Sequence, residues 1–255
     1  MRLITLISDW TTKDYYVGAV KGRILSLCPT ATIVDISHDI MKYSYLQASF
    51  VLKSCYKYFP KDTIHIIGII PQNNKEYPFC VCRYEEQFFI GVDNGLFNIL
   101  FENQPDTIVE LPNTFDSFRE LSIMAEAAGK LAAGADLKQL GAPKDDITHL
   151  PNYLTMDEDN LISGKVIYID SYQNCISDIT RERFENVGKG RNFNITLKTN
   201  KIQIRQISST YNEVSFGDYF AIFNSLQLLE IGQYIGQFAT FNNIEVNSTI
   251  RIKFH

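Results

Sequence analysis

The first seventy residues alternate between apolar runs with strand character and segments with helical spacing. Residues 3–9 and 31–36 form short runs rich in apolar side chains, and residues 63–70 are apolar on both faces of a strand. Between them, residues 16–27 and 45–59 carry apolar side chains at helical spacing. Because strand, helix and strand in succession imply parallel pairing with helical crossovers, this part of the chain predicts an α/β unit with a central, mostly parallel sheet.

Later segments change in character. Residues 119–133 predict one more helix, rich in alanine, but beyond it lie two prolines, two acidic clusters and little periodicity. From residue 163 onward, short β-like runs predominate. We therefore expect an α/β unit at 1–145, a linker at 146–162 and an all-β, barrel-like unit at 163–255.

Composition narrows the class of protein. With 255 residues, 45% of them apolar, the chain is long enough for two packed domains and too apolar to be disordered. Its formal net charge of −5 argues against nucleic acid as a partner. The apolar run before Asp9 is too short to span a membrane. Five cysteines without zinc-ligand spacing indicate free thiols and a cytoplasmic location, with no metal and no cofactor expected.

Polar residues follow the predicted strands of the first unit. Ligands of parallel sheets bind beyond the carboxyl ends of the strands, where Asp9 and His38 stand. A carboxylate such as Asp9 can accept two hydrogen bonds from a diol, although a helix N-cap is an equally simple interpretation. For His38, a structural role is a more common outcome than catalysis.

The second unit has a similar group of candidates. Asp170 and Asn174 follow a β run and could meet a cation and the edge of a base, or could form a plain Asx turn. Ser225 follows another run, and Tyr211 lies in a polar stretch where it could stack on a ring or pack in a core. No glycine-rich phosphate loop, H-E-x-x-H or G-x-S-x-G sequence is present.

Five blocks of sequence together resemble one family, the S-adenosyl-L-methionine hydroxide adenosyltransferases, which form adenosine and are related to the fluorinases and chlorinases. The blocks span residues 4–22 (opening Ile-Thr-Leu-Ile-Ser-Asp), 29–38 (Pro-Thr-Ala-Thr-Ile-Val-Asp-Ile-Ser-His), 89–96 (Phe-Ile-Gly-Val-Asp-Asn-Gly-Leu), 169–174 (Ile-Asp-Ser-Tyr-Gln-Asn) and 223–231 (Phe-Asn-Ser-Leu-Gln-Leu-Leu-Glu-Ile). Their order along the chain makes the resemblance specific.

The resemblance implies a homotrimer with each small-molecule site between subunits, and it assigns roles to residues. Asp9 would hold the ribose diol, Tyr211 would stack on adenine, and Asn174 would hydrogen-bond the edge of the base. Asp170 would take the methionine ammonium, with Ser225 near the carboxylate. Tyr43 and Asn73 complete the expected substrate-binding set, and Asp116 and Ser117 are the expected catalytic candidates.

This chain departs from the hydrolase pattern at three positions. Ile70 stands where the family has an Asp, no Arg follows before Arg83, and Asp116 stands where a His is expected. Two further residues, Gln173 and Gln227, replace glycines of the second-unit motifs and would crowd the pocket.

We therefore expect an S-adenosylmethionine-binding protein in which water displaces methionine at the ribose C5′, giving adenosine and L-methionine. A sulfonium is a good leaving group, so this chemistry mainly requires an in-line nucleophile that is shielded from bulk water. The alternatives are a catalytically silent adenosyl-binding protein, a halide-using relative, or a structural trimer with a vestigial pocket.

Overall fold

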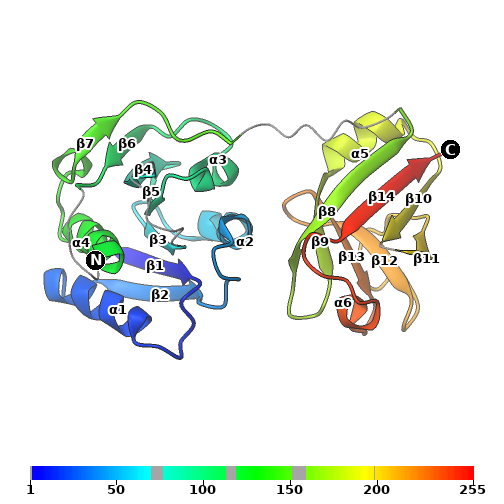
Figure 1. Cartoon of the computed structure of the whole chain (residues 1–255), viewed down its shortest axis with the longest axis horizontal. Coiled ribbons are helices and arrows are strands. Elements are labelled where there is room, and N and C mark those ends of the chain that lie inside the picture. Colours follow the sequence, from blue (N-terminus) through cyan, green and yellow to red (C-terminus); the bar gives the residue numbers. More distant parts are fainter. Residues whose placement is uncertain (1, 70–76, 113–118, 151–158, 198) are drawn as a thin grey trace. The chain divides into compact units, whose positions relative to one another are not determined.

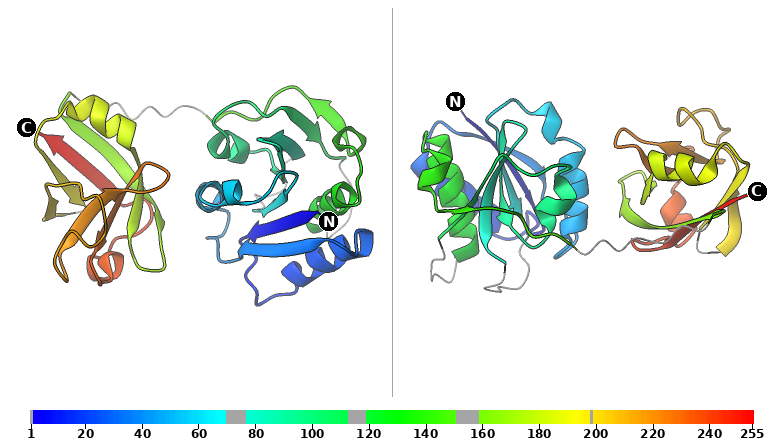
Figure 2. Two further views of the ribbon diagram at one scale, coloured as in Figure 1. Left: turned by 180° about the vertical axis from the view of Figure 1, so that it is seen from behind. Right: turned by 90° about the horizontal axis from the view of Figure 1, so that it is seen from above.

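The computed structural model describes residues 2–69, 77–112, 119–150, 159–197 and 199–255. The chain divides into two compact units, Met1–Pro151 and Asn152–His255, and each has its own sheet (Figures 1 and 2). No helix in the described ranges is long and apolar enough to cross a membrane.

Unit 1 is built on a mixed sheet with the strand order β2-β1-β3-β5-β4-β6-β7. The pairs β2–β1, β1–β3 and β3–β5 are parallel, whereas β5–β4, β4–β6 and β6–β7 are antiparallel. The strands are β1 (Leu3–Ser8), β2 (Thr32–Ser37), β3 (Ile64–Gly68), β4 (Phe79–Tyr84), β5 (Gln87–Val92), β6 (Thr107–Glu110) and β7 (Ala142–Lys144).

The expectation of a mostly parallel sheet is therefore wrong. The physical reason begins at β4 and β5, which are joined by the two residues Glu85 and Glu86. A connection this short can only form a hairpin, and both residues adopt the positive φ, 46° and 62°, that the tightest hairpin turns require. From β4 onward each new strand pairs in the antiparallel sense.

Helices cover both faces of this sheet. Residues of α1 and α4 pack with β1 and β3 in one core cluster, and residues of α2 and α3 pack in a second cluster (Figure 2). The helices are α1 (Tyr16–Leu27), α2 (Tyr45–Lys53), α3 (Leu96–Leu100) and α4 (Arg119–Ala132), with 3-10 turns η1 (Tyr56–Tyr58) and η2 (Leu137–Gln139). The expected helix at 16–27 is confirmed. The one expected at 45–59 ends at Lys53, and Phe59 is extended because Pro60 follows it.

Unit 2 is mainly β, as expected, and adds the helices α5 (Arg181–Gly188) and α6 (Phe238–Phe241). All described pairings in its sheet, ordered β11-β10-β14-β8-β9-β13-β12, are antiparallel. After β11 the backbone N–H of Ser208 donates to the Ala221 carbonyl of β12 (2.8 Å), so the sheet curls toward closure around an apolar core. The strands are β8 (Leu161–Ile169), β9 (Cys175–Thr180), β10 (Phe193–Leu197), β11 (Thr199–Ile204), β12 (Tyr219–Phe223), β13 (Leu228–Gln233) and β14 (Thr249–Phe254).

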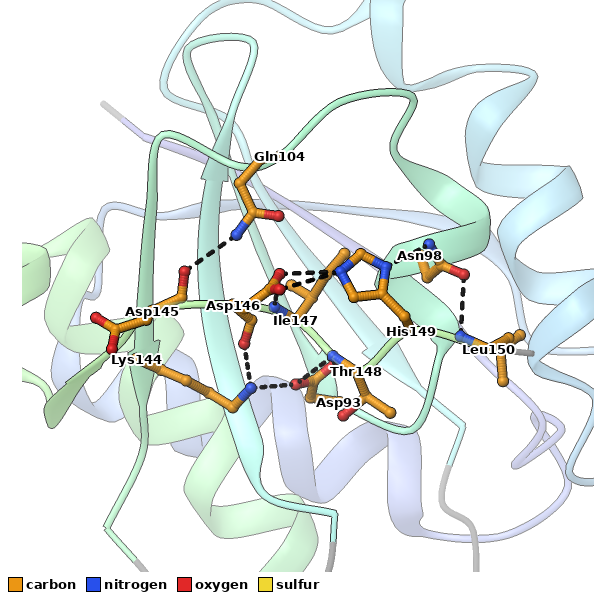
Figure 3. A network of polar contacts seen from close by, with 10 residues as sticks. All are labelled: Asp93, Asn98, Gln104, Lys144, Asp145, Asp146, Ile147, Thr148, His149 and Leu150. Atoms are coloured by element: carbon orange, nitrogen blue, oxygen red, sulfur yellow. Dashed lines mark hydrogen bonds and ion pairs between the residues drawn. The ribbon is translucent and has the colours of Figure 1, made fainter. Parts of the chain in front are cut away.

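The last residues of unit 1 are fastened by a buried carboxylate (Figure 3). Asp93 follows β5 and is fully buried. Both of its oxygens accept from the backbone N–H of Thr148 (2.9 and 3.0 Å), and Lys144 Nζ lies 2.9 Å from Oδ2. Asn98 of α3 also accepts from the Leu150 N–H (3.2 Å). Residues 146–150, expected to begin the linker, are thus attached to the sheet of unit 1.

Breaking the ion pair from one side leaves a charge without its partner. We expect Asp93→Asn to lower the free energy of unfolding by about 3 kcal/mol, because Lys144 then lacks a counter-charge. The double variant with Lys144→Met should recover part of that loss in urea titrations. Equal stability of the wild type and the single variant would contradict this account.

His65 is buried in the middle of β3. Its Nδ1 lies 2.7 Å from Thr5 Oγ1 and its Nε2 lies 2.5 Å from Gln87 Oε1, while its ring stacks on Phe89. Burial lowers the pKa of His65 to about 4, although the Gln87 hydrogen bond by itself raises this pKa. This histidine is a neutral member of the core.

Acid should therefore destabilise unit 1 through His65. Between pH 6.5 and about 4, the unfolded chain binds a proton that the folded chain does not, so stability present above pH 6.5 is lost as the pH falls. The expected loss is about 3 kcal/mol. We expect His65→Gln to flatten this part of the pH profile in urea titrations, whereas His255→Gln at the exposed C-terminus should leave it unchanged. An identical acid loss in His65→Gln and the wild type would overturn the assignment.

Candidate functional site

A cavity of about 500 Å³ lies in unit 2 beside β9, β12 and β13. Three residues singled out from the sequence, Asp170, Asn174 and Tyr211, line this one cavity although they are far apart in the chain. The described residues around it are Asp170, Tyr172, Asn174, Tyr211, Phe220, Gln233, Tyr234, Ile235 and Gly236.

Asp170 and Asn174 are joined by the turn between β8 and β9. Asp170 Oδ1 accepts from the backbone N–H of Asn174 (2.8 Å), and Oδ2 accepts from Asn174 Nδ2 (3.1 Å). Gln173 stands in the left-handed region at φ 67°, which lets the chain turn this tightly. The turn presents a carboxylate and an amide side by side.

Tyr211 forms an aromatic wall of the cavity. Its ring meets Phe220 edge-on, with 5.3 Å between ring centroids, and it is about half exposed. Burial, followed by the Glu230 charge, raises the pKa of Tyr211 to about 12, so the hydroxyl stays protonated and remains a donor. A half-exposed ring that packs edge-on against Phe220 is a suitable stacking surface.

Glu230 is a polar residue that the sequence analysis missed. It lies on the otherwise apolar strand β13 and is only 5% exposed. Asn224 Nδ2 donates to its Oε2 (3.4 Å). Burial raises the pKa of this carboxyl, the nearby charge of Asp170 adds to the shift, and the Tyr211 hydroxyl and the Asn224 hydrogen bond oppose it. A lone acid within Leu-Leu-Glu-Ile was the available signal.

Gly232 and Gln233 shape the wall next to Glu230. A Cβ on Gly232 would lie 2.1 Å from Asn174 Oδ1 and 2.4 Å from Phe220 Cζ, so only glycine leaves room for both side chains. Gln233 Nε2 donates to the Gly217 carbonyl (2.7 Å), which fixes the orientation of this amide. Its buried Oε1 accepts no hydrogen bond from the described residues.

The cavity is not lined by Ser225, Gln173 or Gln227, three residues singled out from the sequence. Ser225 is exposed in the turn between β12 and β13, where Asn224 Oδ1 accepts from the Leu226 and Leu228 backbones (3.0 and 3.2 Å). Thr240 Oγ1 donates to Gln173 (2.9 Å) and Arg181 Nε donates to Gln227 (2.7 Å). Both glutamine side chains are thus engaged elsewhere, and the lining residues of the cavity do not include them.

Asp9 lies in unit 1, just past the carboxyl end of β1. It is 4% exposed, and its Oδ2 accepts from the backbone N–H of Tyr43 (2.8 Å). Lys42 Nζ donates to the Asp9 carbonyl. Tyr43 stands at φ 64° with its ring largely exposed. A single carboxylate oxygen is thereby tied to the backbone, and the loop that it holds displays an aromatic ring.

His38 is built into the same edge of the sheet. Its Nδ1 lies 2.7 Å from the buried hydroxyl of Ser8, and its Nε2 lies 3.1 Å from Asp35 Oδ1. Because Ser8 is almost fully buried, this group of three links β1 to β2 and does not offer an accessible nucleophile.

Three of the expected site residues, Asn73, Asp116 and Ser117, lie outside the described residues, as does Ile70. Across the ranges that the structure does describe, no three His, Cys, Asp or Glu side chains are arranged to hold a metal ion.

Comparison with known proteins assigns both units to the same family. The family model described as the SAM hydroxide adenosyltransferase N-terminal domain matches residues 4–141, and the model of the C-terminal domain of the same name matches residues 164–251. The chain belongs to the SAM hydroxide adenosyltransferase family. The resemblance drawn from the sequence blocks is thereby confirmed.

Two individual relatives are distant in sequence but match nearly the whole chain. An (R)-S-adenosyl-L-methionine hydrolase of Methanocaldococcus jannaschii is 26% identical over 98% of this chain and 95% of the relative. A fluorinase of Actinopolyspora mzabensis is 20% identical over 98% and 96%. The crystal structure of an uncharacterized conserved protein from Thermotoga maritima matches the fold with a TM-score of 0.84 at 21% identity, covering 99% of this chain and all of that one.

The close packing around Gly232 can be tested by substitution. We expect Gly232→Ala to destabilise unit 2 by about 2 kcal/mol, because the new Cβ overlaps Asn174 and Phe220. Trimming the ring in Gly232→Ala with Phe220→Leu should restore part of this loss in thermal unfolding. Gly18→Ala, where an added Cβ meets nothing within 4 Å, is the control. A Gly232→Ala protein as stable as the control would contradict the tight packing.

Proposed function

We propose that this chain binds S-adenosyl-L-methionine and catalyses displacement at the ribose C5′ by water, releasing adenosine and L-methionine. The observation that carries the proposal is the cavity that brings Asp170, Asn174 and Tyr211 together. Family membership and the names of the distant relatives support the same ligand.

Each proposed contact follows from the chemistry of its side chain. Tyr211 offers an aromatic face to adenine, and the amide of Asn174 offers a donor and an acceptor to the edge of the base. Asp170 supplies negative charge for the methionine ammonium, with Ser225 near the methionine carboxylate. Asp9 keeps acceptor sites for the ribose diol beyond the one bond from Tyr43. Tyr43 and Asn73 complete this proposed set.

The reaction needs no group to be oxidised or reduced. The oxygen of water forms a bond to C5′ as the C5′–S bond breaks, and the electron pair of the broken bond stays on sulfur, which becomes the thioether of methionine. The attacking water passes a proton to the solvent. Asp116 and Ser117 are the polar groups that we propose beside the reacting carbon. The site would contribute mainly by orienting water and excluding the rest of the solvent.

A second candidate is a protein that binds an adenosyl ligand without turnover, or that uses a halide instead of water. Ile70 in place of the family's Asp and Asp116 in place of its His favour this alternative. The ligand contacts in unit 2 are common to both candidates, so binding alone does not separate them.

The proposal includes a homotrimer with sites between subunits. Asp9 belongs to one unit, and Asp170, Asn174 and Tyr211 belong to the other. Exposed apolar side chains stand beside both groups, namely Tyr43 in unit 1 and Tyr172 and Ile235 in unit 2. Assembly would cover these side chains and remove apolar surface from water.

The test is to incubate the purified chain with S-adenosylmethionine, with and without chloride, and to follow products by mass-resolved chromatography alongside calorimetric binding. We expect adenosine and methionine in equal amounts and no dependence on chloride. Binding without product would favour the silent candidate, and a chlorinated nucleoside would favour the halide-using one.

In the same assay Asp9→Ala should weaken nucleoside binding about a hundredfold, since two charge-assisted hydrogen bonds are lost. Asp9→Asn, which keeps an acceptor for the Tyr43 backbone, separates ligand contact from loop structure. Asp39→Ala, an exposed acid after β2, should bind like the wild type. Unchanged affinity in Asp9→Ala would overturn the proposed ligand contact.

A further inference from the structure

Gln173 adopts a backbone conformation that its residue type disfavours. It lies in the turn between β8 and β9, and its φ of 67° falls in the left-handed region. There the Cβ of any residue except glycine crowds the neighbouring backbone, which costs free energy. A residue keeps such a conformation only when the contacts around it stabilise that conformation. The contacts of Gln173 therefore decide whether the turn keeps its shape.

Two hydrogen bonds stabilise Gln173, and both come from the same helix. The backbone N–H of Ala239 donates to the Gln173 carbonyl (3.0 Å), and Thr240 Oγ1 donates to Gln173 Oε1 (2.9 Å). Both donors belong to α6, whose residues Phe238 and Ala239 are buried in the core of unit 2. The turn is thus fastened through its main chain and a side chain to a helix that the core holds in place.

The turn and the segment before α6 both line the candidate cavity. Asp170 and Asn174 close the turn, where Gln173 N–H donates to the Asp170 carbonyl (3.0 Å) and Asp170 N–H donates to the Asn174 carbonyl (3.1 Å). Ile235 and Gly236 line the same cavity and lie shortly before α6 in the chain. Gln173 itself does not line the cavity, but its contacts connect two stretches of chain that do.

We propose that Gln173 is a positioning residue, whose hydrogen bond with Thr240 keeps the turn of Asp170 and Asn174 in its strained, ligand-binding shape. The inference rests on the proposed function and deepens it, because it states how the cavity is shaped before an adenosyl ligand arrives. A turn that became ordered only on binding would weaken the affinity. Loss of the bond between Gln173 and Thr240 should therefore weaken binding without removing any group that contacts the ligand.

A second glutamine of unit 2 provides an internal comparison. Gln227 also has a positive φ, of 58°. Its carbonyl accepts from the Arg181 backbone N–H (2.8 Å), and its Oε1 accepts from Arg181 Nε (2.7 Å). Both glutamines are thus stabilised at the carbonyl and at the side chain by one neighbouring segment. Among the described residues that line the cavity, none belongs to the turn of Gln227 at 224–228, so this turn is a matched control.

The test measures binding of S-adenosylhomocysteine by calorimetry in single and double variants. Gln173→Ala keeps the disfavoured φ without the side-chain bond, and Thr240→Val removes the donor at an exposed position. We expect each to weaken affinity about fivefold, the effect of one neutral hydrogen bond. Thr240→Ser keeps the hydroxyl and should bind within about twofold of the wild type. Gln173→Gly should do the same, because glycine adopts positive φ without steric cost. In that background Thr240→Val should have no further effect.

The controls separate positioning from a general loss of structure. Gln227→Ala makes the same change in the other turn and should bind like the wild type. Wild-type affinity in both Gln173→Ala and Thr240→Val would overturn the positioning role. Equal weakening in Gln173→Gly and Gln173→Ala would overturn the link to backbone strain.

Amide hydrogen exchange tests the tether without any ligand. In the free protein Thr240→Val should accelerate exchange of the Asn174 N–H, which donates to Asp170 Oδ1, whereas Gln227→Ala should leave it unchanged. Unchanged exchange at Asn174 in Thr240→Val would overturn this inference whether or not the ligand binds. Failure of the wild type to bind S-adenosylhomocysteine would instead overturn the proposed function, and with it the role of Gln173 in binding.

Discussion

In both units, loops are held by carboxylates that lie just after the strands and accept hydrogen bonds from backbone N–H groups. Asp9 after β1 accepts from Tyr43, Asp93 after β5 accepts from Thr148, and Asp170 after β8 accepts from Asn174. A charged acceptor makes such bonds stronger than those between neutral groups, and burial strengthens them further. The loops carrying the candidate site residues are therefore positioned by local electrostatics, whereas apolar packing accounts for the sheets beneath them.

Helices and strands were predictable where the spacing of apolar residues is regular. The apolar spacing of residues 16–27 locates α1, and the short runs of the second unit predict its β character. The prediction of a mostly parallel sheet failed because strand direction after β3 depends on the turn between β4 and β5. Two glutamates form that turn with positive φ, a conformation that their residue type does not favour. The extended backbone of Phe59 was predictable in principle, since Pro60 restricts the residue before it.

The candidate site was predictable where polar residues stand out from their surroundings. Asp170, Asn174 and Tyr211 lie in turns and polar stretches, and the structure brings them around one cavity. Glu230 and Gly232 lie inside an apolar strand, where a pattern of residue types predicts core. Only the pairing of β12, β13 and β9 places Glu230 between Ile176 and Ile222 and makes Gly232 the residue that leaves space for Asn174 and Phe220. Such contacts arise from strand register, which a single sequence does not reveal.

The turn from Asp170 to Asn174 has a consequence for ligand binding. Both oxygens of the carboxylate receive hydrogen bonds from Asn174, which fix the direction of the carboxylate and leave its charge intact. Each oxygen keeps a further acceptor site, so a donor that enters the cavity meets an acceptor whose orientation is set before binding. The turn therefore reduces the conformational entropy that the Asp170 side chain would lose when a ligand binds.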